Sequence, residues 1–163
     1  MKKSFIFILS FIVTALVSCG DMDDCKVDNT IATSVLITNS GIQNVTLSQI
    51  ANGSYTVYLY KGGYNGDCVK VGLAAADSLV TQYNASKGTS FQVIPSQYYT
   101  IGNAVELNNK HYNDSIQITF SNLSSLDFNT NGDKYVLPLT ISGISSDLIN
   151  QDNKNILIHI SGN

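Results

Sequence analysis

Residues 127–133 hold the side chains whose spacing comes closest to metal-binding chemistry. Oxygen-bearing side chains alternate there, before a turn residue at Gly132: Asp127, Asn129, Asn131 and Asp133. This pattern matches the first half of a calcium loop, but the position where a bidentate glutamate belongs is Pro138. A turn rich in Asn and Asp explains the same residues through local backbone hydrogen bonds. The stretch is a weak calcium candidate, and we expect no metal or other cofactor.

The tyrosines form a second group with recognisable chemistry. The chain has nine tyrosines and no tryptophan. Tyr58, Tyr60 and Tyr64 gather at one expected hairpin, on the face opposite Val57 and Leu59. Sugar rings stack on aromatic faces while the phenol oxygen can form hydrogen bonds, so these three residues are a candidate glycan platform. The alternative is that they pack against a second sheet or under the loop at 98–99.

Hydrolytic chemistry has little support in the sequence. His111 and His159 are the only histidines, and His159 alternates with isoleucines on a face that we expect to meet solvent. A Ser-His-Asp triad needs a positioned base, and glycoside hydrolysis needs paired carboxylates. Glu106 is the only glutamate, and the aspartates fall in turns and near the N-terminus. We therefore expect a protein that is not an enzyme.

The N-terminal segment, residues 1–18, has the three zones of a secretory signal. Lys2 and Lys3 precede an apolar run from Phe5 to Val17, which is shorter than the ~20 residues that span a bilayer. Leu16-Val17-Ser18-Cys19 resembles the lipobox of bacterial lipoproteins, in which the cysteine is acylated after cleavage. The resemblance implies a membrane anchor through lipid on Cys19. The alternative is an N-terminal anchor that is never cleaved.

Residues 19–30 read as a lipidated acidic tether. Asp21, Asp23 and Asp24 follow the cysteine closely, and they resemble the acidic export signal of some Bacteroidetes surface lipoproteins. This predicts an outer-membrane protein exposed on the cell surface. An ordinary solvated tether on the periplasmic face is the alternative.

Two cysteines remain after Cys19 is assigned to lipid. An oxidising compartment permits a disulfide between Cys25 and Cys68. The alternative is that Cys68 is a buried small apolar residue.

Composition narrows the class of partner. Loss of the signal leaves seven lysines against twelve acids, a formal charge of −5, and the chain has no arginine. Nucleic-acid binding would need a basic surface, so that class is excluded. Only 13% of residues are charged, which is typical of an extracellular β-protein.

Short alternating runs predict the elements of one domain over residues 31–163. We expect strands at 34–38, 45–50, 55–60 and 69–73, the last two forming a hairpin. A helix should begin after Asp77 and end at Gly88. Later strands are expected at 91–94, 116–120, 135–141 and 156–160, with Pro138 marking an edge strand or a bulge. This pattern predicts a mainly β fold, a two-sheet β-sandwich with one short helix.

With these residues in view, the stretch from Tyr55 to Ile160 resembles a known family. The strongest matches are Tyr58-Leu59-Tyr60-Lys61-Gly62-Gly63-Tyr64, Asp77-Ser78-Leu79-Val80-Thr81-Gln82-Tyr83-Asn84 and Tyr135-Val136-Leu137-Pro138-Leu139. The family is a Bacteroidetes lipoprotein domain of unknown function, which often precedes family-18 endo-N-acetylglucosaminidase or lectin-like domains. The resemblance implies an immunoglobulin-like β-sandwich and a link to glycan utilisation, and it supplies no catalytic residues. Because the last expected strand ends close to Asn163, we expect no enzyme domain after it.

Two functions are compatible with these observations. The first is a non-catalytic surface lipoprotein that binds or presents glycan for a polysaccharide-utilisation system. The second is a structural module on the outer membrane that docks on neighbouring surface proteins and has no carbohydrate ligand.

Overall fold

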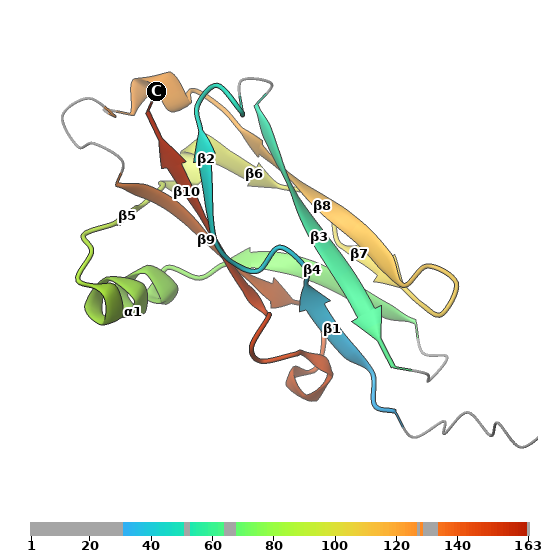
Figure 1. Cartoon of the computed structure of the whole chain (residues 1–163). Helices are drawn as coiled ribbons and strands as arrows, with labels where there is room; N and C mark the ends of the chain where they lie inside the picture. The colour runs from blue at the N-terminus through green and yellow to red at the C-terminus, as the bar shows by residue number, and fades with distance from the viewer. Residues whose placement is uncertain (1–30, 51–52, 64–67, 127, 129–133, 163) are drawn as a thin grey trace, which may run out of the picture.

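The computed structural model describes residues 31–50, 53–63, 68–126, 128 and 134–162. The predicted signal segment, the tether and the calcium candidates Asp127, Asn129, Asn131 and Asp133 lie outside these residues. The described chain forms two β-sheets packed face to face, with one α-helix outside them (Figure 1). The predicted immunoglobulin-like sandwich with one inserted helix is confirmed.

The first sheet has four strands in the order β1-β3-β8-β6. Their bounds are Ser34–Ile37 for β1, Ser54–Gly62 for β3, Asn113–Phe120 for β8 and Tyr99–Ile101 for β6. All three pairings in this sheet are antiparallel. Tyr58 lies opposite Ser115, and Tyr60 lies opposite Asn113.

The second sheet has the order β2-β10-β9-β4-β7, and the short strand β5 also pairs with β9. The bounds are Gly41–Thr46 for β2, Asn155–Ser161 for β10, Tyr135–Ser142 for β9, Val69–Ala75 for β4, Val105–Leu107 for β7 and Gln92–Val93 for β5. The helix α1 spans Ser78–Lys87. Three short 3₁₀ turns complete the described elements: η3 (Ser96–Tyr98), η4 (Leu123–Ser125) and η5 (Ser146–Leu148).

The core lies between the sheets and follows the alternation of each strand. Val57 and Leu59 of β3 and Ile116 and Ile118 of β8 are at most 1% exposed. From the second sheet, Leu137, Leu139, Ile156, Ile158 and Ile160 are also fully buried in the same cluster. Removal of this apolar surface from water is the main free energy that holds the sandwich closed.

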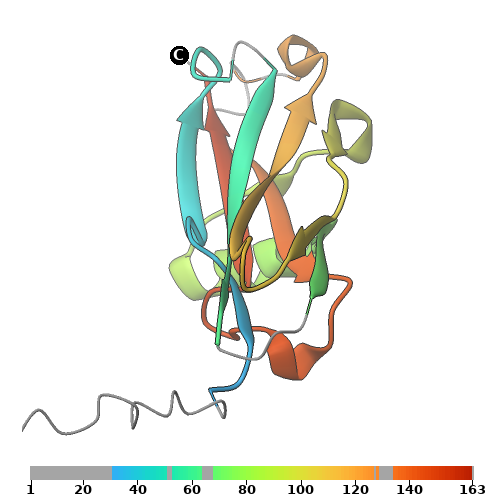
Figure 2. The same cartoon turned by 90° about the vertical axis from the view of Figure 1, so that its right-hand side faces the viewer.

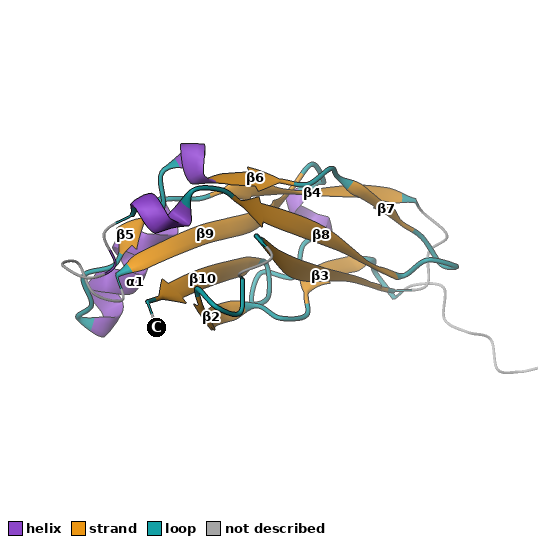
Figure 3. Ribbon diagram, turned by 90° about the horizontal axis from the view of Figure 1, so that it is seen from above, coloured by secondary structure: helices purple, strands orange, loops and turns teal. Residues whose placement is uncertain are grey.

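The helix α1 covers the outer face of the second sheet. Figure 1 shows β9 and β10 between α1 and the first sheet, and Figure 3 shows α1 and β5 beside β9. Val80 of the helix packs on Val136 and Leu157 in a second, smaller apolar cluster. Gly88 ends the helix in the left-handed conformation, as predicted, whereas Asp77 occupies the N-cap without a side-chain capping bond.

Several expectations about strands need correction. The predicted hairpin of residues 55–60 and 69–73 is wrong, because β3 pairs with β1 and β8 while β4 pairs with β9 and β7. The chain crosses from one sheet to the other between them. The strand expected at 45–50 ends at Thr46 and begins at Gly41, and Ile50 is buried in the turn that follows.

Pro138 lies in a central strand, not at an edge or in a bulge. β9 has β10 on one side and β4 and β5 on the other. The Pro138 carbonyl accepts a hydrogen bond from the Ala76 N–H at 3.1 Å, on the β4 side. Because a residue's nitrogen and carbonyl point to the same side of a strand, the missing N–H of proline falls where β5 pairing has ended and β4 pairing begins. No backbone hydrogen bond between β9 and β10 is lost at Pro138.

No helix in the described part of the chain is long and apolar enough to cross a bilayer.

Figure 2 shows that β1 begins at the opposite end of the sandwich from the end of β10.

Candidate functional site

The exposed large apolar side chains of the described residues lie on the outer face of β3 and just before the strands β1 and β8. These are Ile31, Tyr58, Tyr60 and Tyr112, which are 58%, 54%, 38% and 51% exposed. We call these four residues the tyrosine patch. Exposed apolar side chains scattered singly are normal in soluble proteins, whereas a cluster of them marks a binding surface.

The alternation of β3 presents two of these rings to solvent. Val57 and Leu59 point into the core, so Tyr58 and Tyr60 point outward, as the sequence predicts. Their exposure rules out the alternative that these two tyrosines pack against the second sheet. Tyr64, the third member of the predicted platform, lies outside the described residues.

Backbone bonds from the turn after β1 hold Tyr58 in place. The Asn39 side-chain oxygen accepts a hydrogen bond from the Tyr58 N–H at 3.1 Å, and the Thr38 N–H donates to the Tyr58 carbonyl at 3.0 Å. The Asn39 side-chain amide also donates to the Thr56 carbonyl and to the Tyr55 hydroxyl, each at 3.2 Å. Burial raises the pKa of Tyr55 above 10.0, and the bond from Asn39 offsets part of that shift.

Tyr112 joins the patch from the loop between β7 and β8. Asn108 shapes this loop, because its side-chain oxygen accepts bonds from the Lys110 and His111 N–H groups at 2.8 and 3.0 Å. The Lys61 N–H donates to the Tyr112 carbonyl at 2.7 Å. The Tyr60 and Tyr112 rings then meet edge to face, with centroids 5.8 Å apart and planes at 74°.

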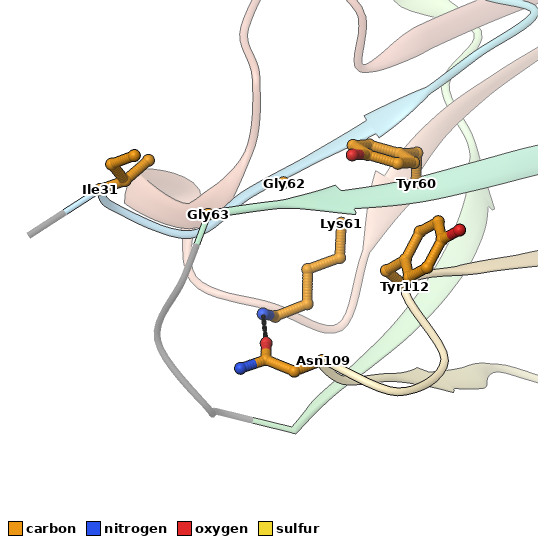
Figure 4. Close-up of a pocket in the computed structure, with 7 residues that line it drawn as sticks. All are labelled: Ile31, Tyr60, Lys61, Gly62, Gly63, Asn109 and Tyr112. Atoms are coloured by element: carbon orange, nitrogen blue, oxygen red, sulfur yellow. Dashed lines mark hydrogen bonds between the residues drawn. The ribbon is translucent and has the colours of Figure 1, made fainter. Parts of the chain in front are cut away.

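Lys61 lies beside the patch but faces inward. It is only 3% exposed, and its Nζ donates to the Asn109 side-chain oxygen at 3.1 Å (Figure 4). A buried ammonium is costly unless it is hydrogen-bonded, so this contact ties the 108–112 loop to the end of β3. Two bonds from Lys61 therefore hold the loop that carries Tyr112: the backbone N–H bonds to the Tyr112 carbonyl, and Nζ bonds to Asn109.

Two adjacent glycines keep the surface beside Tyr60 low. Gly63 has φ +91°, and a Cβ built there would lie 2.5 Å from the Ala32 carbonyl oxygen. Only glycine fits this close approach. Gly62 has no such constraint, and a Cβ there would meet the edge of the Tyr60 ring at 3.6 Å.

Two hollows flank Tyr60, which alone among the described residues lines both. The first is about 360 Å³ and is lined by Ile31, Tyr60, Lys61, Gly62, Gly63, Asn109 and Tyr112 (Figure 4). The second is about 400 Å³ and is lined by Thr38, Tyr58, Leu59, Tyr60, Asn113, Asp114 and Ser115. Each volume is at the lower end of the range for small-ligand sites. Apolar ring faces and polar side chains therefore meet in both hollows.

The sequence interpretation missed Tyr112, Ile31 and the Lys61–Asn109 contact. Tyr112 has the same parity as Ile116 and Ile118, which point inward, so alternation alone would place its ring in the core. The pairing of β3 with the start of β8 brings Tyr112 to Tyr60, and no local pattern signals that pairing.

Those other predicted site residues that the structure describes do not gather into a second centre. Cys68 is exposed rather than buried, with its Sγ 4.0 Å from a Glu106 side-chain oxygen. Its proposed partner Cys25 lies outside the described residues, as does Cys19, so the disulfide and the lipid stay predictions. No group of three or more His, Cys, Asp or Glu side chains among the described residues is arranged to hold a metal ion.

His159 is less exposed than predicted. It does alternate with isoleucines, but the residue is half-buried, and its ring centroid lies 4.7 Å from that of Phe91. Its Nδ1 lies 2.8 Å from the Asn44 side-chain oxygen. The face that we expected to meet solvent is covered by the segment around α1. His111 is exposed on the loop before β8.

Comparisons with known proteins agree with this fold. A family model that describes an N-terminal domain matches residues 27–148. No curated protein matches the sequence.

Several solved structures from Bacteroides have a similar fold. A candidate carbohydrate-binding protein from Bacteroides ovatus matches with a TM-score of 0.63 at 18% identity, over 78% of this chain and 36% of its own. A two-domain protein of unknown function from Bacteroides fragilis matches with a TM-score of 0.59 at 13% identity, over 82% of this chain and 46% of its own. EndoBT-3987 from Bacteroides thetaiotaomicron, solved with a Man5GlcNAc product, matches with a TM-score of 0.57 at 19% identity, over 74% of this chain and 28% of its own.

The chain thus spans less than half the length of each of these structures. At these identities the likeness is one of fold.

Proposed function

Because the chain belongs to this family of N-terminal domains, the Bacteroidetes family that its sequence resembles, we propose that it is a non-catalytic glycan-binding accessory of a polysaccharide-utilisation system. The tyrosine patch is the observation that carries the proposal. Its exposed rings offer apolar faces for the C–H face of a sugar, and a phenol hydroxyl can bond to sugar hydroxyls.

The polar lining of the hollows supports a carbohydrate more than an apolar ligand. Asn109 stands beside Tyr60 and Tyr112, and Asn113 and Ser115 stand beside Tyr58. Sites for small ligands combine apolar walls with a few placed polar groups that fix orientation. Amide and hydroxyl side chains suit a ligand that presents alternating hydroxyl donors and acceptors.

The fold relatives support the same class of function. One is a candidate carbohydrate-binding protein, and another is an endoglycosidase solved with a glycan product. This chain covers only 36% and 28% of those two proteins. The part of their function that we propose for it is the handling of glycan, not the hydrolysis.

We also propose that lipid on Cys19 anchors the protein to the outer membrane and that residues 19–30 tether the domain at the cell surface. The first described residue, Ile31, belongs to the tyrosine patch, so the patch would lie at the tethered end of the domain. Radiolabelled palmitate should enter the wild-type chain and not the Cys19→Ser variant. Surface proteolysis of intact cells should then degrade the protein, whereas resistance would favour the periplasmic face.

A glycan array tests the main proposal. The full chain should bind a restricted set of glycans, and Tyr60→Ala should weaken that binding about 30-fold, because truncation of a central tyrosine in a binding surface costs about 2 kcal/mol. Tyr83→Ala, which removes a tyrosine of α1, is the matched control and should leave the affinity unchanged. Absence of binding to every glycan, together with capture of a surface protein that Tyr60→Ala abolishes, would favour the docking module instead.

A further inference from the structure

From the two hollows we infer the form of the ligand: an internal stretch of a neutral, linear oligosaccharide that runs along β3, with one part in each hollow and Tyr60 between them. This inference rests on the proposed glycan-binding function. It adds that affinity depends on the length and the charge of the oligosaccharide rather than on a single terminal sugar.

The arrangement of the hollows supports successive subsites. Tyr58 and Tyr60 are two residues apart on one strand, so their positions are about 6.8 Å apart along it. One hollow opens on each side of Tyr60, and each has its own second ring, Tyr112 in the first and Tyr58 in the second.

The charges at the site disfavour an anionic glycan. Among the described residues that line the two hollows, Lys61 and Asp114 carry the charges. Lys61 is 3% exposed and donates to Asn109, so its ammonium is not presented as an anion clamp. Asp114 is exposed at the second hollow, where its carboxylate can accept hydrogen bonds from sugar hydroxyls and repels a uronate or a sulfate. The chain has no arginine for bidentate binding of such groups.

Each hollow can be filled separately without removal of a tyrosine. Gly62 lies in the first hollow, and a Cβ there has ordinary contacts of 3.6 Å to Tyr60 and 3.7 Å to the Ser34 carbonyl oxygen. Gly62→Val should therefore fill that hollow without backbone strain. Ser115 shares the outward face with Tyr58 and lines the second hollow, so Ser115→Ile should fill it. Gln117→Ile is the matched control, because Gln117 is exposed on β8 and lines neither hollow.

The experiment is calorimetric titration of the full chain with length series of mannan, xylan and α-glucan oligosaccharides, from monosaccharide to hexasaccharide, and with oligogalacturonides as the anionic series. For a neutral series that binds, affinity should rise several-fold with each added sugar until both hollows are occupied and should then level off. Gly62→Val and Ser115→Ile should each remove that gain at an earlier length, while Gln117→Ile should match the wild type.

The outcomes separate this inference from the proposed function. Binding that does not depend on length, or that only one of the two filling variants weakens, would overturn the two-hollow arrangement and leave glycan binding intact. Tighter binding of the oligogalacturonides than of any neutral series would overturn the charge argument. Absence of binding to every series, in agreement with an empty glycan array, would remove the proposed function itself.

Discussion

Aromatic residues lie in opposite surroundings on the two sides of the sandwich. On the side of the second sheet, Tyr83 of α1 and Phe91, which precedes β5, stack with centroids 5.7 Å apart, and Val80 of α1 packs on Val136 and Leu157. On the first sheet, Tyr58, Tyr60 and Tyr112 are exposed. The difference arises from the chain between β4 and β5, which carries α1 across one sheet. An aromatic residue of this fold is therefore packed away or left open to a ligand according to whether another element covers it.

The largest effect that separates the two faces should be on stability. Leu157→Ala removes a 93% buried side chain beneath α1 and should lower the free energy of unfolding by about 2–5 kcal/mol, because it leaves a cavity. Tyr58→Thr on the open face should change the same quantity by less than about 0.5 kcal/mol, since threonine suits a strand and the site is exposed. Urea denaturation measures both. Equal losses of unfolding free energy in the two variants would mean that Tyr58 is packed as Leu157 is.

A smaller loss is expected where the open face is fixed to the turn after β1. Asn39→Ala removes the acceptor for the Tyr58 N–H and the donor to the Thr56 carbonyl. We expect a loss of about 1–2 kcal/mol in unfolding free energy, the cost of unsatisfied backbone groups. Asn39→Asp is the comparison variant because it keeps the acceptor for Tyr58, and it should recover part of the loss. No recovery would show that the bond to Tyr58 contributes nothing.

The edge-to-face contact of Tyr60 and Tyr112 should couple the two residues. A double-mutant cycle with Tyr60→Ala and Tyr112→Ala, read by urea denaturation, should give an interaction free energy of about 0.5–1.5 kcal/mol. The matched cycle on the covered face uses Tyr83→Ala and Phe91→Ala. A coupling of zero at the exposed pair would mean that the two rings do not hold each other in place.

The smallest effect should appear at alkaline pH. Burial raises the pKa of Tyr55 above 10.0, and burial with the nearby Asp77 carboxylate raises that of Tyr99. The unfolded chain loses these protons first, so the stability that they contribute is present below about pH 10 and falls as pH rises through the folded pKa. Tyr55→Phe with Tyr99→Phe should flatten this fall in denaturation experiments between neutral and strongly alkaline pH. An unchanged pH profile would contradict the assignment.

Local patterns in the sequence predicted the elements better than their partners. Alternation at 55–60 and 116–120 and the glycine at position 88 gave two strands and the helix end, because these signals depend on neighbouring residues. The hairpin of 55–60 with 69–73 failed because β3 finds its partners far along the chain, in β1 and β8. Pro138 predicted an edge strand or a bulge, but its missing N–H donor falls between two partner strands.

The same limit applied to the candidate site. Tyr58 and Tyr60 were predictable because Val57 and Leu59 fix which face is buried. Tyr112 was not, since its place depends on a loop shaped by Asn108 and on a backbone bond to Lys61. The cover over His159 was hidden for a related reason: it comes from Phe91, 68 residues earlier in the sequence.

The most direct test of the central claim is a map of where glycan contacts the protein. Amide chemical shifts of the isotope-labelled chain should be recorded while the best-binding glycan from the array is added. The amide chemical shifts should change along β3, at the start of β8 and in the 108–112 loop. The chemical shifts of α1, β9 and β10 should stay the same. Movement centred on α1 and the covered face, with the tyrosine patch unchanged, would contradict the account.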